Sequence, residues 1–209
     1  GQGGLISRAS DILLELAEYL QIPLGTTTPG KGTIPENHPL ALRVIGGRGG
    51  MAYSNNYVCE ADTVFFVGTN TDSAATDHWK LYGDPNSKTF IHLDIAEAHI
   101  GNNFPVKVGL VGDARASLEY MVEVLKSDYP DPRRETVDLN PMKATALNKV
   151  FNSNIPMPQG TVSPVKLTQA LDKMLPSNAI VTSEPGVSAI YPSALLTIKE
   201  AGRRYITNY

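Results

Sequence analysis

Hydrophobic and polar residues follow two different patterns along the first part of the chain. Between Ser10 and Leu20 the apolar positions recur every three or four residues, which is typical of a helix with one buried face. Residues 63–67, 88–94 and 106–111 instead form short apolar runs with little alternation. Runs of this kind are typical of parallel strands that are buried on both faces.

Further elements fill the spaces between these strands. Residues 24–28 are predicted to form a short strand and residues 51–60 a helix, and Asp113 is placed to cap a helix that carries the next apolar stripe. Strands that alternate with helices indicate βαβ units. We therefore expect an α/β fold with a doubly wound, Rossmann-like parallel sheet and helices on both of its faces.

The composition changes between residues 128 and 164, where six prolines occur. Such a segment predicts a semi-stiff connector. A helix, a strand, a second helix and a second strand are predicted after it, which is the beginning of another α/β unit. We therefore divide the chain into a first domain at residues 1–128, a proline-rich linker at 129–163 and a truncated second domain at 164–209.

Composition and charge restrict the classes of partner. The 209 residues are 42% hydrophobic and 19% charged, as in ordinary globular proteins, and the net charge of −3 predicts neither a nucleic-acid partner nor an anionic membrane partner. No apolar run approaches the roughly 18 residues that span a bilayer, and the N-terminus lacks the features of a signal peptide. A single cysteine, Cys59, is typical of a reducing compartment, so we expect a cytoplasmic protein.

A glycine cluster is the first candidate for a binding site. Gly46, Gly47, Gly49 and Gly50 stand before the predicted helix at residues 51–60, where glycines let the backbone approach a pyrophosphate at the positive end of a helix. The cluster is not a G-x-G-x-x-G motif, and no strand clearly precedes it. Tight packing of two elements is therefore the alternative interpretation.

Polar residues at two predicted strand ends are the second candidate. Thr69 and Asn70 follow the strand at residues 63–67, and Asp94 ends the strand at residues 88–94. Ligands of doubly wound sheets lie beyond the carboxyl ends of the strands, and an acid there can accept a hydrogen bond from a ribose hydroxyl. The alternative is that Asp94 caps a turn and that Thr69 and Asn70 are ordinary turn residues.

The sequence does not indicate a metal site or a nucleophilic active site. The histidines at positions 38, 78, 92 and 99 lack the spacing of metal ligands, and Cys59 has no second thiol partner. The chain contains no G-x-S-x-G elbow and no P-loop. We therefore expect no metal site, and no catalytic residue is assigned.

Several short segments together carry a likeness to a known family. In chain order they are Gly1-Gln2-Gly3-Gly4, Ile22-Pro23, Gly30-Lys31-Gly32, Pro35-Glu36-Asn37-His38-Pro39, Glu60-Ala61-Asp62, Ile91-His92-Leu93-Asp94, Ile100-Gly101-Asn102-Asn103 and Val111-Gly112-Asp113-Ala114. Their order and spacing resemble the central domain of thiamine-diphosphate-dependent enzymes of the acetolactate synthase and pyruvate oxidase family. Residues 181–209 resemble the opening of the diphosphate-binding, carboxyl-terminal domain of that family.

This resemblance implies a central domain with a six-stranded parallel sheet, which holds FAD in some members, ADP in others and nothing in many. It also implies that Gly186, Val187 and Ser188 lie where the family contacts the cofactor diphosphate. The segment Thr69-Asn70-Thr71-Asp72-Ser73 lacks the basic character of the corresponding segment of acetolactate synthase. The residues that match the FAD-contacting segments are Gly46, Gly47, Gly49, Gly50, Gly68, Thr69, Asn70, Asp94 and Ile95.

The function implied by the resemblance belongs to a longer protein. The parent would be an acetolactate-synthase-like enzyme that uses thiamine diphosphate and Mg²⁺ to decarboxylate a 2-oxo acid and pass the two-carbon unit to an acceptor. This chain lacks the Gly-Asp-Gly metal motif and the pyrimidine-binding domain with its glutamate, so we expect it to be inactive alone. Its partners would be that amino-terminal domain, the rest of the carboxyl-terminal domain and further copies in a homo-oligomer. The alternative is a non-catalytic module that binds FAD or ADP, or only a scaffold.

Overall fold

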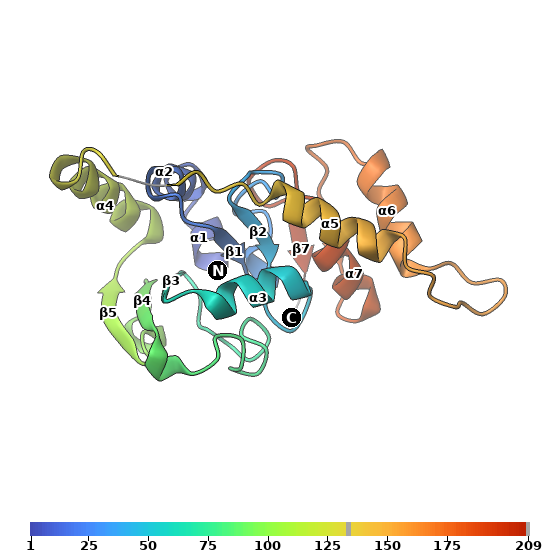
Figure 1. Ribbon diagram of the computed structural model, residues 1–209, viewed down its shortest axis with the longest axis horizontal. Helices are drawn as coiled ribbons and strands as arrows, with labels where there is room; N and C mark the ends of the chain where they lie inside the picture. Colours follow the sequence, from blue (N-terminus) through green and yellow to red (C-terminus); the bar gives the residue numbers. More distant parts are fainter. Residues whose placement is uncertain (133–134, 208–209) are drawn as a thin grey trace.

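The computed structural model describes residues 1–132 and 135–207, so residues 133–134 of the predicted linker and 208–209 of the predicted second domain lie outside the described residues. Helices and strands alternate along most of the chain (Figure 1). The helices are α1 (Gln2–Ile6), α2 (Ser10–Leu20), α3 (Ala52–Glu60), α4 (Ala114–Asp128), α5 (Asn140–Phe151), α6 (Pro164–Met174) and α7 (Val187–Leu195). The strands are β1 (Leu24–Thr26), β2 (Ala41–Val44), β3 (Thr63–Val67), β4 (Thr89–Asp94), β5 (Val106–Val111), β6 (Val181–Ser183) and β7 (Tyr205–Thr207).

The strand pairings of the described residues are all parallel. Strand β1 pairs with β2, β4 lies between β3 and β5, and β6 pairs with β7. Parallel strands with helices between them confirm the α/β class. The number of strands in one sheet differs from the expected six, because the described part of the first domain has one sheet of two strands and another of three. Residues of both β1 and β3 line one cavity.

Strand β2 lies where the sequence pattern predicts no clear strand, directly before the glycine cluster. All four of its residues are buried, including Arg43, whose charge obscures the apolar pattern. The φ of Arg43 is +67°, and the β1–β2 register shifts beside it, between Leu24 and Gly25. Irregularities of this kind redirect a side chain. That of Arg43 reaches residues 194–197 near the end of the chain.

Apolar clusters cover both faces of β3. Phe65 and Val67 pack against a cluster formed largely by α2 and α4, which includes the fully buried Leu118. Phe66, between them, belongs to a second cluster, against which Val58 of α3 packs. Alternate side chains of a strand point to opposite faces, so a strand covered on both must be apolar throughout. The expectation of helices on both faces is confirmed.

The end of the chain has the predicted order of helix, strand, helix and strand, in α6, β6, α7 and β7. Helix α5 lies within the predicted linker and is not isolated, because Phe151 at its end packs with Val165 and Leu195. The division at residues 128 and 164 stays a prediction. Helix α7 contacts β2, so this part of the chain lies against the predicted first domain.

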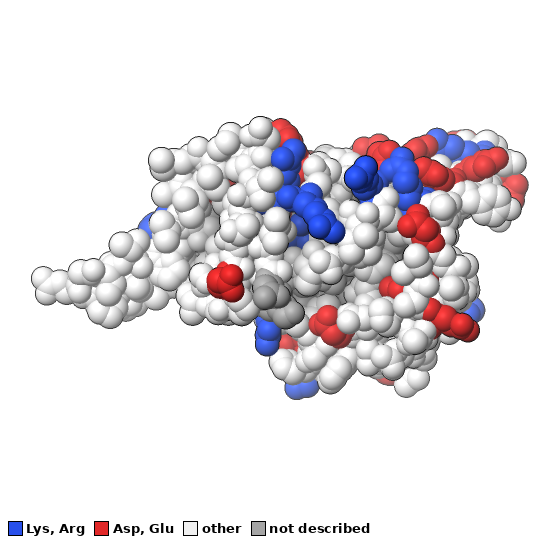
Figure 2. All heavy atoms as spheres, turned by 180° about the vertical axis from the view of Figure 1, so that it is seen from behind, with Lys and Arg blue, Asp and Glu red and all other residues white. Residues whose placement is uncertain are grey.

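Acidic and basic side chains lie beside one another on the face shown in Figure 2, most densely around α2 and α4. Arg115 bonds Asp11 at 2.8 Å and Lys126 bonds Glu15 at 2.5 Å across these two helices. This face therefore does not carry a field of one sign. None of the helices within residues 1–132 and 135–207 is long and apolar enough to cross a membrane.

Candidate functional site

Most residues predicted to bind a cofactor lie at the carboxyl ends of parallel strands. Gly46 comes shortly after β2, Gly68 directly follows β3 and Asp94 ends β4. The loop after β3 reaches the glycine cluster, because Gly47 N donates to Ala74 O at 2.9 Å. The structure therefore brings the glycine cluster together with the loop that follows Gly68, although β2 and β3 belong to different sheets.

The glycine cluster (residues 46–50) is packed closely against that loop. Gly46 has a φ of +103°, and a Cβ added to it would lie 2.6 Å from the carbonyl oxygens of both Ala74 and Ala75. Its N–H donates to Asn55 Oδ1 at 2.9 Å, and the N–H of Gly47 is engaged by Ala74. These two N–H groups therefore do not fit a bound phosphate in this arrangement. A phosphate at Gly49 and Gly50 stays a prediction.

The loop that begins at Gly68 is held by backbone contacts. Gly68 has a φ of +56°, and its carbonyl oxygen accepts from Gly3 N at 2.9 Å. His92 Nε2 donates to Thr69 O at 2.8 Å, and burial lowers the pKa of this histidine. Asn103 Nδ2 donates to Asn70 O at 3.2 Å. The structure thus fixes the path of Gly68, Thr69 and Asn70, and their contact with a ligand stays a prediction.

Asp94 is almost fully buried and caps the turn that follows β4. Its Oδ1 accepts from Ala96 N at 2.9 Å and lies 3.2 Å from His99 Nδ1. Ile95 beside it is exposed over 74% of its surface. The turn-capping role is therefore present in the structure, and a ribose contact of Asp94 stays a prediction.

The residues predicted near the cofactor diphosphate lie together at the beginning of α7. Gly186 precedes the helix with a φ of +130°, and a Cβ added there would meet nothing within 4 Å. Val187 is 60% exposed, and Ser188 Oγ donates to Glu184 O at 3.0 Å. The beginning of this helix is open and is preceded by a glycine with a positive φ, which glycine adopts without strain. Such a helix end is suited to an anion. These residues therefore fit a diphosphate group.

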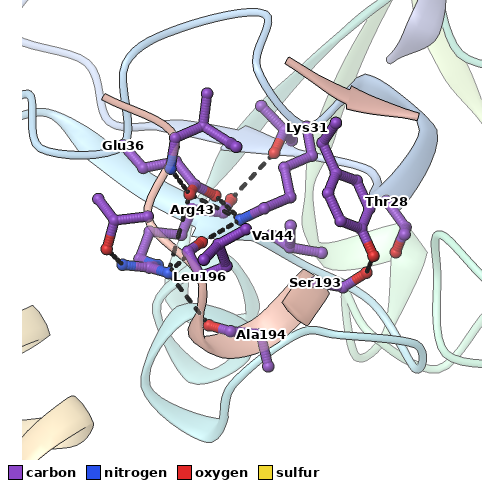
Figure 3. A network of polar contacts seen from close by, with 12 residues as sticks. Thr28, Lys31, Glu36, Arg43, Val44, Ser193, Ala194 and Leu196 are labelled. Atoms are coloured by element: carbon purple, nitrogen blue, oxygen red, sulfur yellow. Dashed lines mark hydrogen bonds and ion pairs between the residues drawn. The ribbon is translucent and has the colours of Figure 1, made fainter. Parts of the chain in front are cut away.

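A buried group of charges, which the sequence analysis did not identify, connects the two ends of the chain. Lys31 Nζ lies 2.6 Å from both carboxylate oxygens of Glu36 and donates to Leu196 O at 2.8 Å. The second carboxylate oxygen of Glu36 also accepts from Ile198 N at 2.8 Å. Figure 3 shows these contacts together with Arg43, and we call Lys31, Glu36 and Arg43 the charged junction.

Arg43 extends the charged junction toward the end of α7. Its two terminal nitrogens donate to Thr197 Oγ1 at 3.0 Å, Leu196 O at 2.9 Å and Ala194 O at 3.3 Å, and one lies 3.7 Å from Glu36 Oε2. Carbonyl oxygens at the end of a helix carry partial negative charge and favour a cation. The guanidinium therefore holds the carboxyl-terminal end of α7.

Burial makes the charged junction sensitive to the loss of one member. The side chains of Lys31 and Glu36 are 0% and 1% exposed, and burial lowers the pKa of Lys31 to about 8 although the Glu36 carboxylate opposes that change. Lys143 of α5 donates to Glu36 O at 3.0 Å, and burial also lowers its pKa to about 8. The Glu36 carboxylate thus compensates cations that have no access to water.

Two features of the sequence point to the charged junction in retrospect. Lys31 stands between two glycines, and Arg43 interrupts an otherwise apolar segment. Neither identifies its partners, because residues 196–198 lie more than 150 positions away. In the part of the chain that the structure describes, no group of three or more His, Cys, Asp or Glu residues is arranged to hold a metal ion.

Comparisons with known proteins agree on one family. The sequence model described as "Thiamine pyrophosphate enzyme, central domain" matches residues 1–121. A probable acetolactate synthase large subunit of Methanococcus aeolicus is 32% identical over 203 residues, which cover 91% of this chain and 33% of that protein. An acetolactate synthase of Arthrospira platensis is 30% identical over 100% of this chain and 35% of its own length.

A glyoxylate carboligase of Escherichia coli O157:H7 is 28% identical over 94% of this chain and 33% of its own length. The similarity to these three relatives therefore extends beyond the family match at residues 1–121 into the predicted second domain. The chain spans about a third of the length of these relatives.

The charged junction yields a prediction for stability. We expect Glu36→Gln to lower the free energy of unfolding by about 3 to 5 kcal/mol, because it leaves buried cations without their carboxylate. Urea denaturation followed by circular dichroism measures this change. As the control, Glu15→Gln removes the half-exposed carboxylate that bonds Lys126, and we expect a loss of at most about 1 kcal/mol. Equal losses in the two variants would contradict the role given to the charged junction.

Proposed function

Because the chain belongs to the thiamine pyrophosphate enzymes and contains their central domain, we propose that it forms the middle part of an acetolactate-synthase-like carboligase. The observation that carries this proposal is the similarity to two acetolactate synthases and a glyoxylate carboligase along 91% or more of the chain. These relatives favour an enzyme over the alternative of a free-standing nucleotide-binding or scaffolding module.

The reaction of the proposed enzyme splits a 2-oxo acid and forms a new carbon–carbon bond. A 2-oxo acid such as pyruvate loses CO₂, and the remaining two-carbon unit adds as a carbanion equivalent to the carbonyl carbon of an acceptor. Thiamine diphosphate, held with Mg²⁺, supplies the electron sink for this chemistry. No residue of this chain is assigned a role in the bond-making steps.

The proposed contribution of this chain is to bind and position. The backbone at Gly186, Val187 and Ser188 would hold the diphosphate at the beginning of α7, where Gly186 leaves the approach open. Arg43 and Lys31 bond Leu196 O, just beyond the other end of the same helix. A helix of nine residues is about 13 Å long and α7 contains Pro192, so fixing its carboxyl-terminal end restricts the position of its beginning. The charged junction would thereby position the diphosphate site relative to the central domain.

Other parts of the proposed enzyme are inferred from the family. They are the amino-terminal pyrimidine-binding domain and the remainder of the carboxyl-terminal domain, in a homo-oligomer located in the cytoplasm. The chain covers about a third of the length of each relative, which agrees with a chain that contains only part of the enzyme. A flavin or ADP at the strand ends would be an addition to this function and not a condition for it.

Activity measurements test the proposed function. We expect the full-length gene product to form acetolactate from pyruvate when thiamine diphosphate and Mg²⁺ are added, and to lose this activity after both are removed by chelation and dialysis. The purified 209-residue chain, which lacks the Gly-Asp-Gly motif, should release no CO₂ under the same conditions. Steady decarboxylation by that chain, or a full-length protein that joins neither pyruvate nor glyoxylate to an acceptor, would contradict the proposal.

Calorimetric titration tests the predicted nucleotide groove. We expect ADP to bind the 209-residue chain with a dissociation constant in the millimolar range, because Gly46 and Gly47 already use their N–H groups within the chain. Asp94→Ala should abolish the heat. Asp84→Ala is the matched control, since Asp84 also caps a turn but precedes β4 instead of ending it. Absence of heat with both ADP and FAD, or equal heat in the two variants, would leave the scaffold interpretation.

A further inference from the structure

Helix α7 contains a proline, so the contacts of the charged junction with one of its ends do not by themselves fix the other. Pro192 lies inside the helix and has no N–H to donate to Ser188 O. The first turn of α7, at the proposed diphosphate site, is therefore joined to the rest of the helix by one backbone hydrogen bond fewer than usual. Its position depends on contacts with other elements.

Tyr205, the first residue of β7, supplies such contacts through its hydroxyl group. Its Oη donates to Ala189 O in the first half of α7 at 3.0 Å. A phenol has one proton to donate, and its oxygen can also accept. Because that proton is directed to Ala189, the hydroxyl groups of Ser183 and Ser193 donate to the same oxygen, at 2.8 and 3.0 Å.

The three partners of this hydroxyl lie on both sides of the turn at Gly186 and on both sides of Pro192. Ser183 ends β6 before the turn, and Ala189 follows the turn. Ala189 precedes Pro192, whereas Ser193 comes directly after it. One oxygen atom thus connects the strand before the turn with the first and the second half of α7. The segment that contains the proposed diphosphate site is held at both of its ends by that atom.

The ring of Tyr205 is itself held in place. Tyr205 is 3% exposed and belongs to a buried cluster with Leu196 and Ile198. Lys31 Nζ lies 5.8 Å from the centroid of the ring, which is within the range of a cation–π contact. The charged junction therefore supports the ring whose hydroxyl bonds the first half of α7, in addition to its own bonds with residues 194–198.

Ser193 is also held by the glycine cluster. Gly49 has a φ of +91°, and a Cβ added to it would lie 2.4 Å from the Cβ of Ser193. Ser193 is fully buried, and Figure 3 shows it in the same polar network as Lys31. A side chain at position 49 would displace Ser193, so this glycine contributes to the packing of α7.

We propose that Tyr205 is a positioning residue for the cofactor diphosphate, a role that rests on the proposed function. Its hydroxyl holds Ser183 and Ala189, so that the backbone of residues 186–188 has one arrangement before the diphosphate binds. Tyr205 acts through these two residues and is assigned no contact with the cofactor. A site that is ordered in advance binds its ligand more tightly, because less conformational entropy is lost on binding.

Hydrogen exchange in the 209-residue chain tests whether Tyr205 holds the first turn of α7. Tyr205→Phe removes the hydroxyl and keeps the ring. We expect it to speed exchange at the amides of Ala189 and Ile190 by about tenfold, because it leaves the buried Ala189 O with one hydrogen bond fewer. These two amides donate to Gly186 O at 3.1 and 3.2 Å, so they report on this turn.

Tyr53→Phe is the matched control. Tyr53 of α3 is half-buried and donates to Leu42 O at 3.0 Å, so this variant loses a comparable hydrogen bond outside β6, α7 and β7. Equal exchange at the two α7 amides in both variants would overturn the proposal. If Tyr205→Phe does not fold, Ser183→Ala takes its place, since it removes the bond on the β6 side and should speed exchange at the same amides.

Cofactor binding by the full-length protein separates a positioning role from a general loss of stability. We expect Tyr205→Phe to raise the dissociation constant of thiamine diphosphate, measured with Mg²⁺, about tenfold and to leave kcat at saturating cofactor within about twofold. Tyr53→Phe should change neither, even where it lowers the melting temperature equally. The same dissociation constant in both variants would overturn the proposal. An unsubstituted full-length protein that does not bind thiamine diphosphate would instead contradict the proposed function, and the exchange measurement would still decide whether Tyr205 holds the beginning of α7.

Discussion

The carboxylate of Glu36 is the group on which the joining of the two ends of the chain depends. It lies between the buried cations of Lys31 and Arg43 and also accepts the amide N–H of Ile198. Charges that are removed from water are stable only when each is compensated, so no member can leave alone without a large loss of stability. The first domain and the segment after α7 are therefore expected to unfold together, although the prolines between them predict a separable connector.

The compensation of the buried charges agrees with the difference between the two candidate sites, at the strand ends and at the beginning of α7. At the strand ends of the first domain, Gly46 packs against the loop at residues 74–75, and Asp94 caps its own turn, so the chain itself occupies much of that edge. At α7 the beginning of the helix is open, while residues just past its other end are bonded to Arg43 and Lys31. A first domain that is filled at its strand ends but holds α7 firmly is suited to positioning a cofactor site.

Local patterns in the sequence predicted the elements that depend on local physics. Strands β3, β4 and β5 followed from short apolar runs, and α4 begins directly after its expected cap, Asp113, whose carboxylate accepts from Ala116 N. Strand β2 was missed because Arg43 is buried by partners at residues 194–197, which no local pattern shows. The charged junction was missed for the same reason. The number of strands in one sheet was not predicted correctly, because it depends on whether β1 and β3 lie next to each other. For the predicted cofactor residues, the sequence indicated that they follow the carboxyl ends of strands but not that Gly46 and Gly47 use their N–H groups internally.

Hydrogen exchange at the amide of Ile198 tests most directly whether the charged junction unites the two ends of the chain. This amide donates to Glu36 Oε2 at 2.8 Å, whereas Phe90 belongs to the buried β4 of the first domain. If the junction holds, the amide of Ile198 opens only when the whole chain unfolds, and its opening free energy equals that of Phe90. Exchange of Ile198 as fast as that of Gln159, in the exposed segment before α6, would contradict the account.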